Sequence, residues 1–350
     1  MAKNLLPRWP NVGIARTRPD VPRAVEPERL AEDRIMAKIS PLADKLVVLI
    51  GGSGFIGTHV AQDLLERGAR VRIAAREPEK AFKLKPLANL GQLQFARCDV
   101  TNASSIEACM RGADAAVYLV GTFGANQRII QARGARDAAR AAAEMGASRF
   151  VYVSAIGADA QSDTGYYATK GRGEDLVLEA FPDATIIRPS VVFGEEGGMI
   201  PMFADMIQVA PVLPVFGADS PMQPVWVDDL AQAIGNALAD PRTHGGKVYE
   251  AAGPQRLTML QINRMIAEGQ DRNRTFLPVP GPLAKMIAAL PLAPINGDQL
   301  AMLKRGNVAS SDIRQIGELG VDPKPLSLFL DRWMVRYRKH GRFSDKRATM

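Results

Sequence analysis

The chain has few of the residues that build disulfide frameworks and metal sites. Of its 350 residues, two are cysteine and three are histidine. Two cysteines build no disulfide framework and indicate a reducing compartment. Cys98 falls on a predicted strand and Cys109 on a predicted helix, so we expect both to be small core residues. His59, His244 and His340 lack the spacing typical of metal ligands, so the sequence predicts no metal site.

Long apolar runs are also missing. No run approaches the roughly 20 residues that a membrane-spanning helix needs, so no segment is expected to span a bilayer. The apolar fraction of 47% still suffices for a core in one large or two smaller domains. A net charge of +7 and a pI of about 9.5 favour an anionic partner, although an ordinary basic surface has the same charge. Aromatic and basic residues are not interleaved, so no nucleic-acid partner is predicted.

The first 40 residues differ from the rest in composition. Prolines interrupt them, basic and acidic residues are mixed, and neither a secretory signal nor a transit peptide is indicated. The string Met36-Ala-Lys repeats Met1-Ala-Lys shortly before the first predicted strand. Either Met36 is the true start, or residues 1–40 are an extended tail that lies on a partner. Both interpretations predict disorder in the isolated chain.

Strand and helix patterns alternate from Leu46 onward. Such alternation predicts a parallel sheet with helices on both faces, which is the Rossmann-type doubly wound α/β fold. After Gly194, short helices rich in proline and methionine predict a smaller C-terminal α/β lobe. The predicted strands are 46–50, 71–75, 93–97, 114–120, 149–154 and 184–188, and the predicted helices are 57–67, 102–111, 127–145, 166–180 and 228–239, followed by 199–209, 258–268, 282–290, 298–305 and 326–338 in the lobe.

The clearest motif is Gly51-Gly-Ser-Gly-Phe-Ile-Gly57, which joins the first strand to the first helix. Glycine at this spacing allows a tight turn, a close approach of the backbone to a pyrophosphate, and close packing of the helix on the sheet. The phosphates would lie on free N–H groups at the helix N-terminus. A second strand follows, which favours a dinucleotide site over a ligand-free turn. The expected contacts are Gly51, Ser53, Gly54, Phe55, Ile56 and Gly57.

The end of the second strand favours NADP(H) over NAD(H). NAD-binding versions of this fold place an acidic residue there to hold the ribose hydroxyls. Here alanine is followed by Arg76, whose guanidinium can pair with a 2′-phosphate, and Lys80 follows in the next turn. The alternative is a solvated arginine at a strand end. The predicted domains are therefore a flexible leader (1–40), a NAD(P)-binding Rossmann domain (41–194) and a smaller mixed lobe with a helical basic C-terminus that shares the cleft (195–350).

Residues after the third, fourth and fifth strands complete the predicted site. Asp99 and Val100 follow the third strand, where the carboxylate can accept the adenine amino group, and Gly121 permits close approach of the adenosine ribose. Ordinary turn chemistry explains these three residues equally well.

Tyr166 precedes Lys170 by four residues, so both lie on one helix face. The ammonium would depress the pKa of Tyr166 and hold the nicotinamide ribose. Tyr166 would then be a general acid for carbonyl reduction, with Ser154 polarising the carbonyl.

Three motifs together resemble the extended short-chain dehydrogenase/reductase superfamily. They are 51–57, Tyr166-x-x-x-Lys170 and Arg188-Pro-Ser-Val-Val-Phe-Gly194, and 223–229 is similar to that superfamily's Val-Asp-Asp stretch. Further stretches resemble an atypical branch that includes subunit nine of the alpha subcomplex of respiratory complex I. The resemblance extends from about Leu46 to Phe343, and its further stretches are 91–95, 166–174, 181–190, 223–225, 298–304 and 319–323.

This branch implies tight NADPH binding remote from the electron-transfer chain. It also implies a peripheral accessory role in complex I near the membrane, without known oxidoreductase activity. Ser154 lies one residue closer to Tyr166 than in the compact enzymes of the superfamily, which puts its catalytic role in doubt. We therefore expect an NADP(H)-binding accessory protein with a structural or assembly-related role. The alternative is an active NADP-dependent reductase or sugar-nucleotide epimerase. Its catalytic residues would be Tyr166, Lys170 and Ser154. The cofactor contacts that the branch implies are Gly51, Gly54, Gly57, Arg76, Lys170 and Pro189.

The C-terminal segment 331–342 combines basic and aromatic residues. This pattern suits an anionic membrane surface or an acidic face of a complex I subunit. The alternative is an amphipathic helix whose aromatic residues join the core. An apolar contact through 282–294 would add to the attachment, and the expected location is peripheral, on the cytoplasmic face of an inner membrane or on the matrix face of a mitochondrial one. The residues concerned are Arg332, Trp333, Arg336, Tyr337, Arg338, Lys339 and Arg342.

Overall fold

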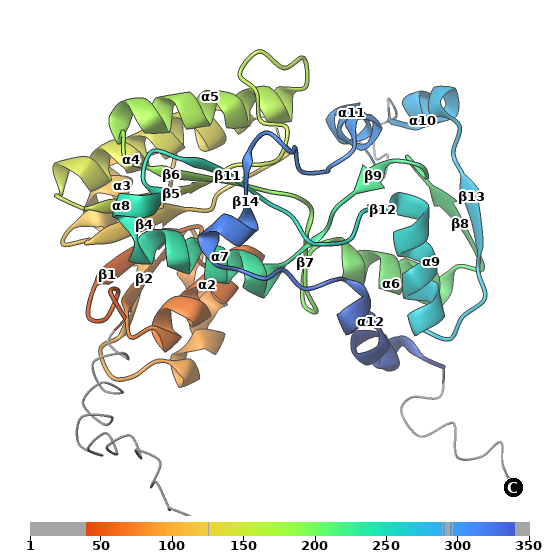
Figure 1. Ribbon diagram of the computed structural model, residues 1–350, viewed down its shortest axis with the longest axis horizontal. Helices are drawn as coiled ribbons and strands as arrows, with labels where there is room; N and C mark the ends of the chain where they lie inside the picture. The colour runs from red at the N-terminus through yellow and green to blue at the C-terminus, as the bar shows by residue number, and fades with distance from the viewer. Residues whose placement is uncertain (1–39, 125, 289, 291–294, 296, 340–350) are drawn as a thin grey trace, which may run out of the picture. The chain divides into compact units, whose positions relative to one another are not determined.

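Eight strands form the central sheet, and every pairing in it is parallel (Figure 1). Their order is β14-β11-β6-β5-β4-β1-β2-β3. The order reverses between β1 and β4, which is the point where sheets of this kind bind ligands at the carboxyl ends of their strands. This sheet confirms the predicted Rossmann-type fold. The strands are β1 (Leu46–Ile50), β2 (Arg70–Ala75), β3 (Leu93–Arg97), β4 (Ala115–Tyr118), β5 (Arg149–Val153), β6 (Thr185–Pro189), β11 (Val248–Ala251) and β14 (Arg314–Gln315).

The computed structural model describes residues 40–124, 126–288, 290, 295 and 297–339. The predictions made for residues 1–39, His340 and Arg342, and for part of 282–294, lie outside the described residues.

Two apolar clusters cover the two faces of the sheet. All five residues of β1 are buried; Val47 and Leu49 belong to one cluster, and Val48 and Ile50 to the other. An unbroken apolar run is the pattern expected of a parallel strand that is covered on both faces. Cys98 and Cys109 are buried in the second cluster with free thiols, which confirms them as core residues.

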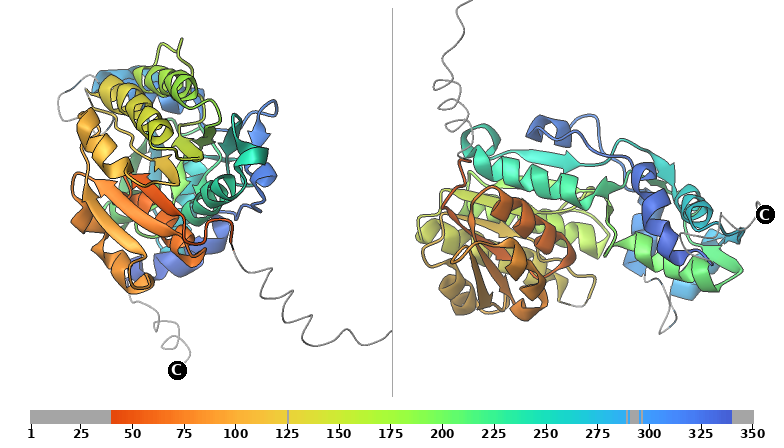
Figure 2. Two further views of the ribbon diagram at one scale, coloured as in Figure 1. Left: turned by 90° about the vertical axis from the view of Figure 1, so that its left-hand side faces the viewer. Right: turned by 90° about the horizontal axis from the view of Figure 1, so that it is seen from below.

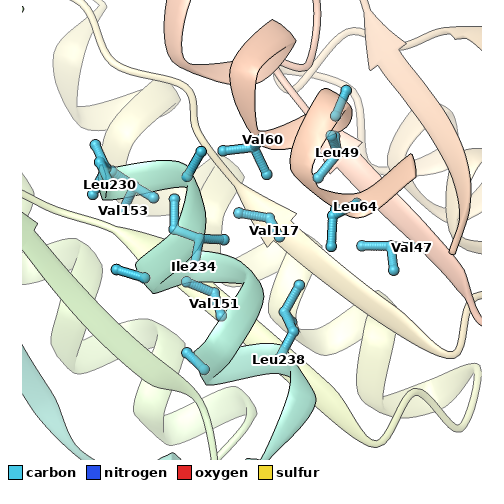
Figure 3. Close-up of a cluster of buried hydrophobic side chains, with 14 of the residues drawn as sticks. Val47, Leu49, Val60, Leu64, Val117, Val151, Val153, Leu230, Ile234 and Leu238 are labelled. Carbon is cyan, nitrogen blue, oxygen red and sulfur yellow. The ribbon is translucent and has the colours of Figure 1, made fainter. Parts of the chain in front are cut away.

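Helices from both halves of the chain complete these clusters. On one face, α2 and α7 bring Val60, Leu64 and Ile234 against the sheet (Figure 3). On the other face, α3, α4 and α5 pack side by side (Figure 2). The helices are α2 (Phe55–Glu66), α3 (Ala103–Met110), α4 (Gly134–Glu144), α5 (Gly165–Ala180) and α7 (Val227–Ala239).

The helix predicted over 127–145 begins as a π-helix, η2 (Arg128–Arg133), and continues as α4. Gly134 lies at the junction, where an added Cβ would lie 2.8 Å from the Tyr118 hydroxyl oxygen and 2.9 Å from the Val100 carbonyl oxygen. Glycine therefore lets this helix approach β4 closely. Single π-turns inside helices often lie at functional sites.

The chain after residue 194 contributes both to the central sheet and to a second group of elements. It supplies α7, β11 and β14 to the sheet and its cover. Its other elements enclose a third apolar cluster. They are α6 (Met199–Val209), β8 (Val212–Val215), α9 (Met259–Gly269), β13 (Thr275–Pro278), α12 (Ser327–Trp333) and η4 (Met334–Tyr337). The helix α11 (Gly297–Arg305) packs against this cluster through Leu303, and α10 (Gly281–Ala288) packs with α11 in a separate small apolar cluster.

Short elements connect these parts. They are η1 (Pro78–Leu87), β7 (Val192–Phe193), β9 (Pro221–Met222), β10 (Val225–Trp226), α8 (Pro241–His244), β12 (Leu257–Thr258) and η3 (Ile316–Leu319).

The aromatic residues of the C-terminal segment belong to the third cluster. Trp333 stacks on Phe329 with ring centroids 4.8 Å apart, and Trp333 and Tyr337 are each 7% exposed. The structure therefore favours aromatic residues in the core over aromatic residues at a membrane interface. Arg338 Nε also donates a hydrogen bond to the Gly269 carbonyl at 2.9 Å. In the part of the chain that the structure describes, no helix is long and apolar enough to cross a membrane.

Candidate cofactor site

The glycine-rich loop has the geometry that its sequence predicts. Gly51 has φ +85°, in the left-handed region that favours glycine, and its N–H donates to the Ala74 carbonyl at 2.8 Å. A Cβ added at Gly57 would lie 2.6 Å from the Gly51 carbonyl oxygen and 2.6 Å from Gly52 Cα. Both atoms belong to backbone, so only glycine lets α2 begin this close to the loop.

The N-terminus of α2 points its free backbone donors at the carboxyl edge of the sheet. Gly54 is the N-cap and provides no side-chain cap, and the first helical bond runs from Thr58 N–H to the Gly54 carbonyl at 3.0 Å. The N–H groups of the first helical turn therefore remain available for an anion. The Phe55 ring itself packs against Gly194 and Gly197, so this residue meets a ligand through its backbone.

The end of β2 carries no carboxylate, but an acidic residue follows closely. Ala75 ends the strand, and Arg76 is exposed. Lys80 donates to Glu77 Oε1 at 2.9 Å, and this bond holds the pKa of Glu77 below its ordinary value. Lys80 is thus occupied by an ion pair, a partner that the sequence prediction did not consider.

At the end of β3, Asp99 is held in a local turn. Its Oδ1 accepts the Thr101 N–H at 2.9 Å and the Thr101 hydroxyl at 2.8 Å. The backbone bond from Thr101 is the main cause that lowers the pKa of Asp99, so the carboxylate is charged at neutral pH. Val100 packs beside it against the second apolar cluster. Asp99 Oδ1 therefore stabilises the turn, and its second carboxylate oxygen can still accept a hydrogen bond from an adenine amino group.

Lys170 is buried between α5 and β5. The residue is 3% exposed, and Nζ donates to the Val153 carbonyl at 2.9 Å. Burial lowers the pKa of Lys170 to about 8, and Glu174 acts in the opposite direction. An ammonium group has three donors, and the described protein uses one of them here. A Cβ added at Gly121 would lie 3.6 Å from Nζ. Gly121 thus borders the residue predicted for the nicotinamide ribose, whereas the sequence prediction placed it at the adenosine ribose.

Tyr166 lies at the same site, but in an environment that the sequence did not predict. Its ring stacks on Phe123 with centroids 4.6 Å apart. Burial raises the pKa of Tyr166 well above its ordinary value, and the Tyr167 ring adds to the shift. The expectation that Lys170 lowers this pKa was wrong, because desolvation dominates and Nζ is bound to Val153.

Gln131 is a site residue that the sequence reasoning missed. It lies in η2, fully buried, and its Nε2 donates to the Thr169 hydroxyl at 3.1 Å. Its Oε1 makes no hydrogen bond in the described structure and would lie 3.6 Å from a Cβ at Gly121. Its neighbours in the sequence include Gln127, Arg128 and Arg133, so no local pattern singles Gln131 out.

Unsatisfied polar atoms test whether these residues fit a nicotinamide nucleotide. The buried Ser154 hydroxyl and Gln131 Oε1 have no partner among the described residues, and Lys170 has spare donors. Buried polar groups are rarely left unpaired without a reason. Ribose hydroxyls both donate and accept, so the residues present fit such a group. Pro189, at the end of β6, accepts the Ile156 N–H beside them at 3.0 Å.

Metal ligation finds no support in the described residues. Among them, no group of three or more histidine, cysteine, aspartate or glutamate side chains is arranged to hold a metal ion.

Comparison with known proteins identifies the chain's relatives. Residues 51–205 match the family model described as NAD(P)H-binding, so this stretch is a NAD(P)-binding domain. The chain is 28% identical over 319 residues to the mitochondrial NADH-ubiquinone oxidoreductase 40 kDa subunit of Neurospora crassa, covering 89% of this chain and 84% of the relative. Among solved structures, the chain is similar to the dTDP-glucose 4,6-dehydratase of Streptomyces venezuelae, which was solved with NAD bound. The TM-score is 0.65 at 20% identity, and the alignment covers 83% of this chain and 96% of that one. This similarity supports the fold.

A second relative decides the family. The mitochondrial NADH dehydrogenase (ubiquinone) 1 alpha subcomplex subunit 9 of Mus musculus is 30% identical over 320 residues, which cover 88% of this chain and 84% of the relative. This match therefore covers well over two thirds of both chains. The chain therefore belongs to the family of NADH dehydrogenase (ubiquinone) 1 alpha subcomplex subunit 9.

Proposed function

We propose that the chain is an NADP(H)-binding accessory protein of respiratory complex I that holds its cofactor without turnover. The observation that carries this proposal is the geometry of the glycine-rich loop and of Lys170. The loop from Gly51 to the N-terminus of α2 leaves free backbone N–H donors for a pyrophosphate, and Lys170 Nζ donates to the Val153 carbonyl and to no tyrosine among the described residues. The relatives that match along most of the chain are named as subunits of an NADH-ubiquinone oxidoreductase, which supports the partner.

Different residues of the site would bind different parts of the cofactor. Backbone N–H groups at the start of α2 would hold the pyrophosphate, Arg76 the 2′-phosphate and Asp99 the adenine amino group. Lys170 and Ser154 would hold the nicotinamide ribose with their unused polar atoms. The nicotinamide ring supplies hydride chemistry when it is bound. Arg76, in place of an acidic residue, supports NADP(H) over NAD(H).

Tyr166 is poorly suited to act as a general acid. Such groups are most effective when their pKa lies near the operating pH. Burial raises the pKa of Tyr166, which moves it further from neutral pH. Lys170 Nζ donates to the Val153 carbonyl. The residues of the site thus favour cofactor retention over catalysis.

Attachment to complex I is supported by exposed apolar residues on α10 and just after it. Met286 is 69% exposed and Leu290 61% exposed, and Lys285 is the one charged residue in the sequence from 275 to 297. Charge depletion with exposed methionine is typical of the centre of a protein interface. We place the chain peripherally on the cytoplasmic face of an inner membrane, or on the matrix face of a mitochondrial one. The exposed Arg332 and Lys339 would add only a salt-screened attraction.

An active NADP-dependent reductase or sugar-nucleotide epimerase is the second candidate. The observation in its favour is that Tyr166 and Lys170 share α5 and that Lys170 and Ser154 are both buried at the end of β5. The Ser154 hydroxyl in particular is buried without a partner, as a group that polarises a carbonyl would be.

The variant Tyr166→Phe separates the two candidates. We expect it to bind NADPH within about twofold of the wild type, because the Tyr166 hydroxyl makes no hydrogen bond in the described structure and the ring stays stacked on Phe123. Neither protein should oxidise NADPH in the steady state. Fluorescence titration measures binding, and absorbance at the nicotinamide band measures turnover. Sustained oxidation of NADPH by the wild type with a small carbonyl or sugar-nucleotide substrate, abolished in Tyr166→Phe, would replace the accessory role with the enzymatic one.

A further inference from the structure

Arg97 lies beside the predicted 2′-phosphate position. It is the last residue of β3, and its Cα is paired with Ala75, the last residue of β2, in the parallel register. The residue that follows Ala75 is Arg76. One arginine therefore follows β2 and another ends the neighbouring β3, both at the carboxyl edge of the sheet, where this fold binds its ligands.

The guanidinium groups of Arg76 and Arg97 are both available for a ligand. Each residue is exposed, and neither side chain has a hydrogen bond or an ion pair among the described residues. The other cations nearby are occupied. Lys80 pairs with Glu77, and Arg72 donates to Gln94 Oε1 and to two backbone carbonyls.

Acidic residues surround the predicted phosphate position in the sequence. Glu77, Glu79 and Asp99 carry three negative charges, and Arg76 and Lys80 carry two positive charges, so these five groups have a net charge of −1. Arg76 and Arg97 both help to lower the pKa of Glu77, which places them in one electrostatic neighbourhood. Arg97 offsets this negative charge and adds a second guanidinium for a phosphate that carries nearly two negative charges.

We propose that Arg97 is a second determinant of cofactor choice, whose guanidinium donates to the 2′-phosphate of NADP(H) together with that of Arg76. This inference rests on the proposed NADP(H) site. Guanidinium groups bind phosphate oxygens through paired donors, and two of them can surround a terminal phosphate from different sides. NAD(H) lacks this phosphate, so Arg97 acts on NADP(H) alone.

The experiment compares nucleotides with and without the 2′-phosphate. NADPH and NADH are titrated by fluorescence, and 2′,5′-ADP and 5′-AMP by competition, against the wild type, Arg76→Ala, Arg97→Ala and Arg97→Lys. Arg70→Ala is the matched control, because Arg70 is an exposed arginine at the opposite end of β2.

We expect the wild type to prefer NADPH. Arg76→Ala should lose roughly ten- to hundredfold in NADPH affinity, and Arg97→Ala about three- to tenfold, since the phosphate keeps one guanidinium partner in each. The same losses should appear with 2′,5′-ADP, whereas NADH and 5′-AMP should change by less than about twofold. Arg97→Lys should recover part of the loss, because it restores charge without the paired donors.

Two outcomes would overturn the assignment of Arg97. A third outcome would overturn the proposed NADP(H) site itself. If Arg97→Ala leaves NADPH and 2′,5′-ADP binding unchanged while Arg76→Ala weakens both, Arg97 has no such role and the NADP(H) site stands. If Arg97→Ala weakens NADPH and NADH equally, its effect is structural. If the wild type binds NADPH and NADH equally well, the proposed preference for NADP(H) fails, and the role of Arg97 fails with it.

Discussion

Replacing Lys170 by methionine is expected to stabilise the protein and to remove most of its affinity for NADPH. The lysine is 3% exposed, and burial lowers its pKa from the ordinary 10.5 to about 8. A shift of this size corresponds to about 3 kcal/mol of unfavourable burial of the ammonium at neutral pH. Methionine has a similar length and no charge, so much of this penalty disappears. The loss of the hydrogen bond to the Val153 carbonyl offsets part of the gain.

The sign of the pH dependence follows from the same shift. Between pH 8 and pH 10.5 the unfolded chain binds more protons at Lys170 than the folded chain. Stability therefore rises with pH through this window, and the penalty of the buried ammonium is fully present below it. The advantage of Lys170→Met should be about 1–3 kcal/mol at pH 7 and should shrink as the pH approaches 10.

Cofactor binding should change in the opposite direction. Lys170 has unused donors beside Gly121, at the expected position of the nicotinamide ribose. Hydrogen bonds from a charged donor contribute about 1.5–3 kcal/mol, so NADPH affinity should fall roughly ten- to hundredfold. Urea unfolding at pH 7 and pH 9.5 and fluorescence titration measure the two effects. Lys304→Met, at an exposed lysine, is the control. A less stable Lys170→Met with unchanged pH dependence would show that the ammonium is not buried at a cost.

Gly57→Ala is expected to cause a comparable loss of binding for a different reason. The added Cβ would lie 2.6 Å from the Gly51 carbonyl oxygen and from Gly52 Cα. Neither backbone atom can rotate away, so the start of α2 must move from the loop. Loss of about 2–3 kcal/mol of charged hydrogen bonds to the pyrophosphate corresponds to a roughly 30- to 150-fold weaker affinity.

This effect should be equal for NADPH and NADH, since both nucleotides share the pyrophosphate. Stability should fall by about 1–3 kcal/mol, as in other overpacked sites. Gly317→Ala is the matched control, because a Cβ added there meets nothing within 4 Å. Normal affinity of Gly57→Ala for both nucleotides would argue against a pyrophosphate at this loop.

The loop and the sheet were predictable because their signals are local. The spacing of Gly51, Gly54 and Gly57 after an apolar strand specifies both the turn and the start of the helix. Lys170 was predictable for the same reason, since a helix fixes its position relative to Tyr166. The strand order from β3 to β5 follows from the crossover rules of such folds.

The missed features depend on contacts between distant segments. The pKa of Tyr166 is set by burial, in which the stacked Phe123 from another loop takes part. Gln131 reaches the site through a π-helix, which shifts the helical register in a way that periodicity does not reveal. Trp333 joins the third apolar cluster because it packs against Phe193 and Phe329. Phe193 is distant in the sequence, and the basic residues next to Trp333 give no sign of this contact.

Isolation of complex I from the source organism in mild detergent tests the central claim most directly. The isolated complex is washed at high salt, and its content of this chain is quantified by mass spectrometry. The account predicts the chain in about equimolar amount with the core subunits after the wash, because an apolar interface through α10 resists salt. A chain found wholly in the soluble fraction at low salt, and absent from the purified complex, would contradict both the accessory role and the location.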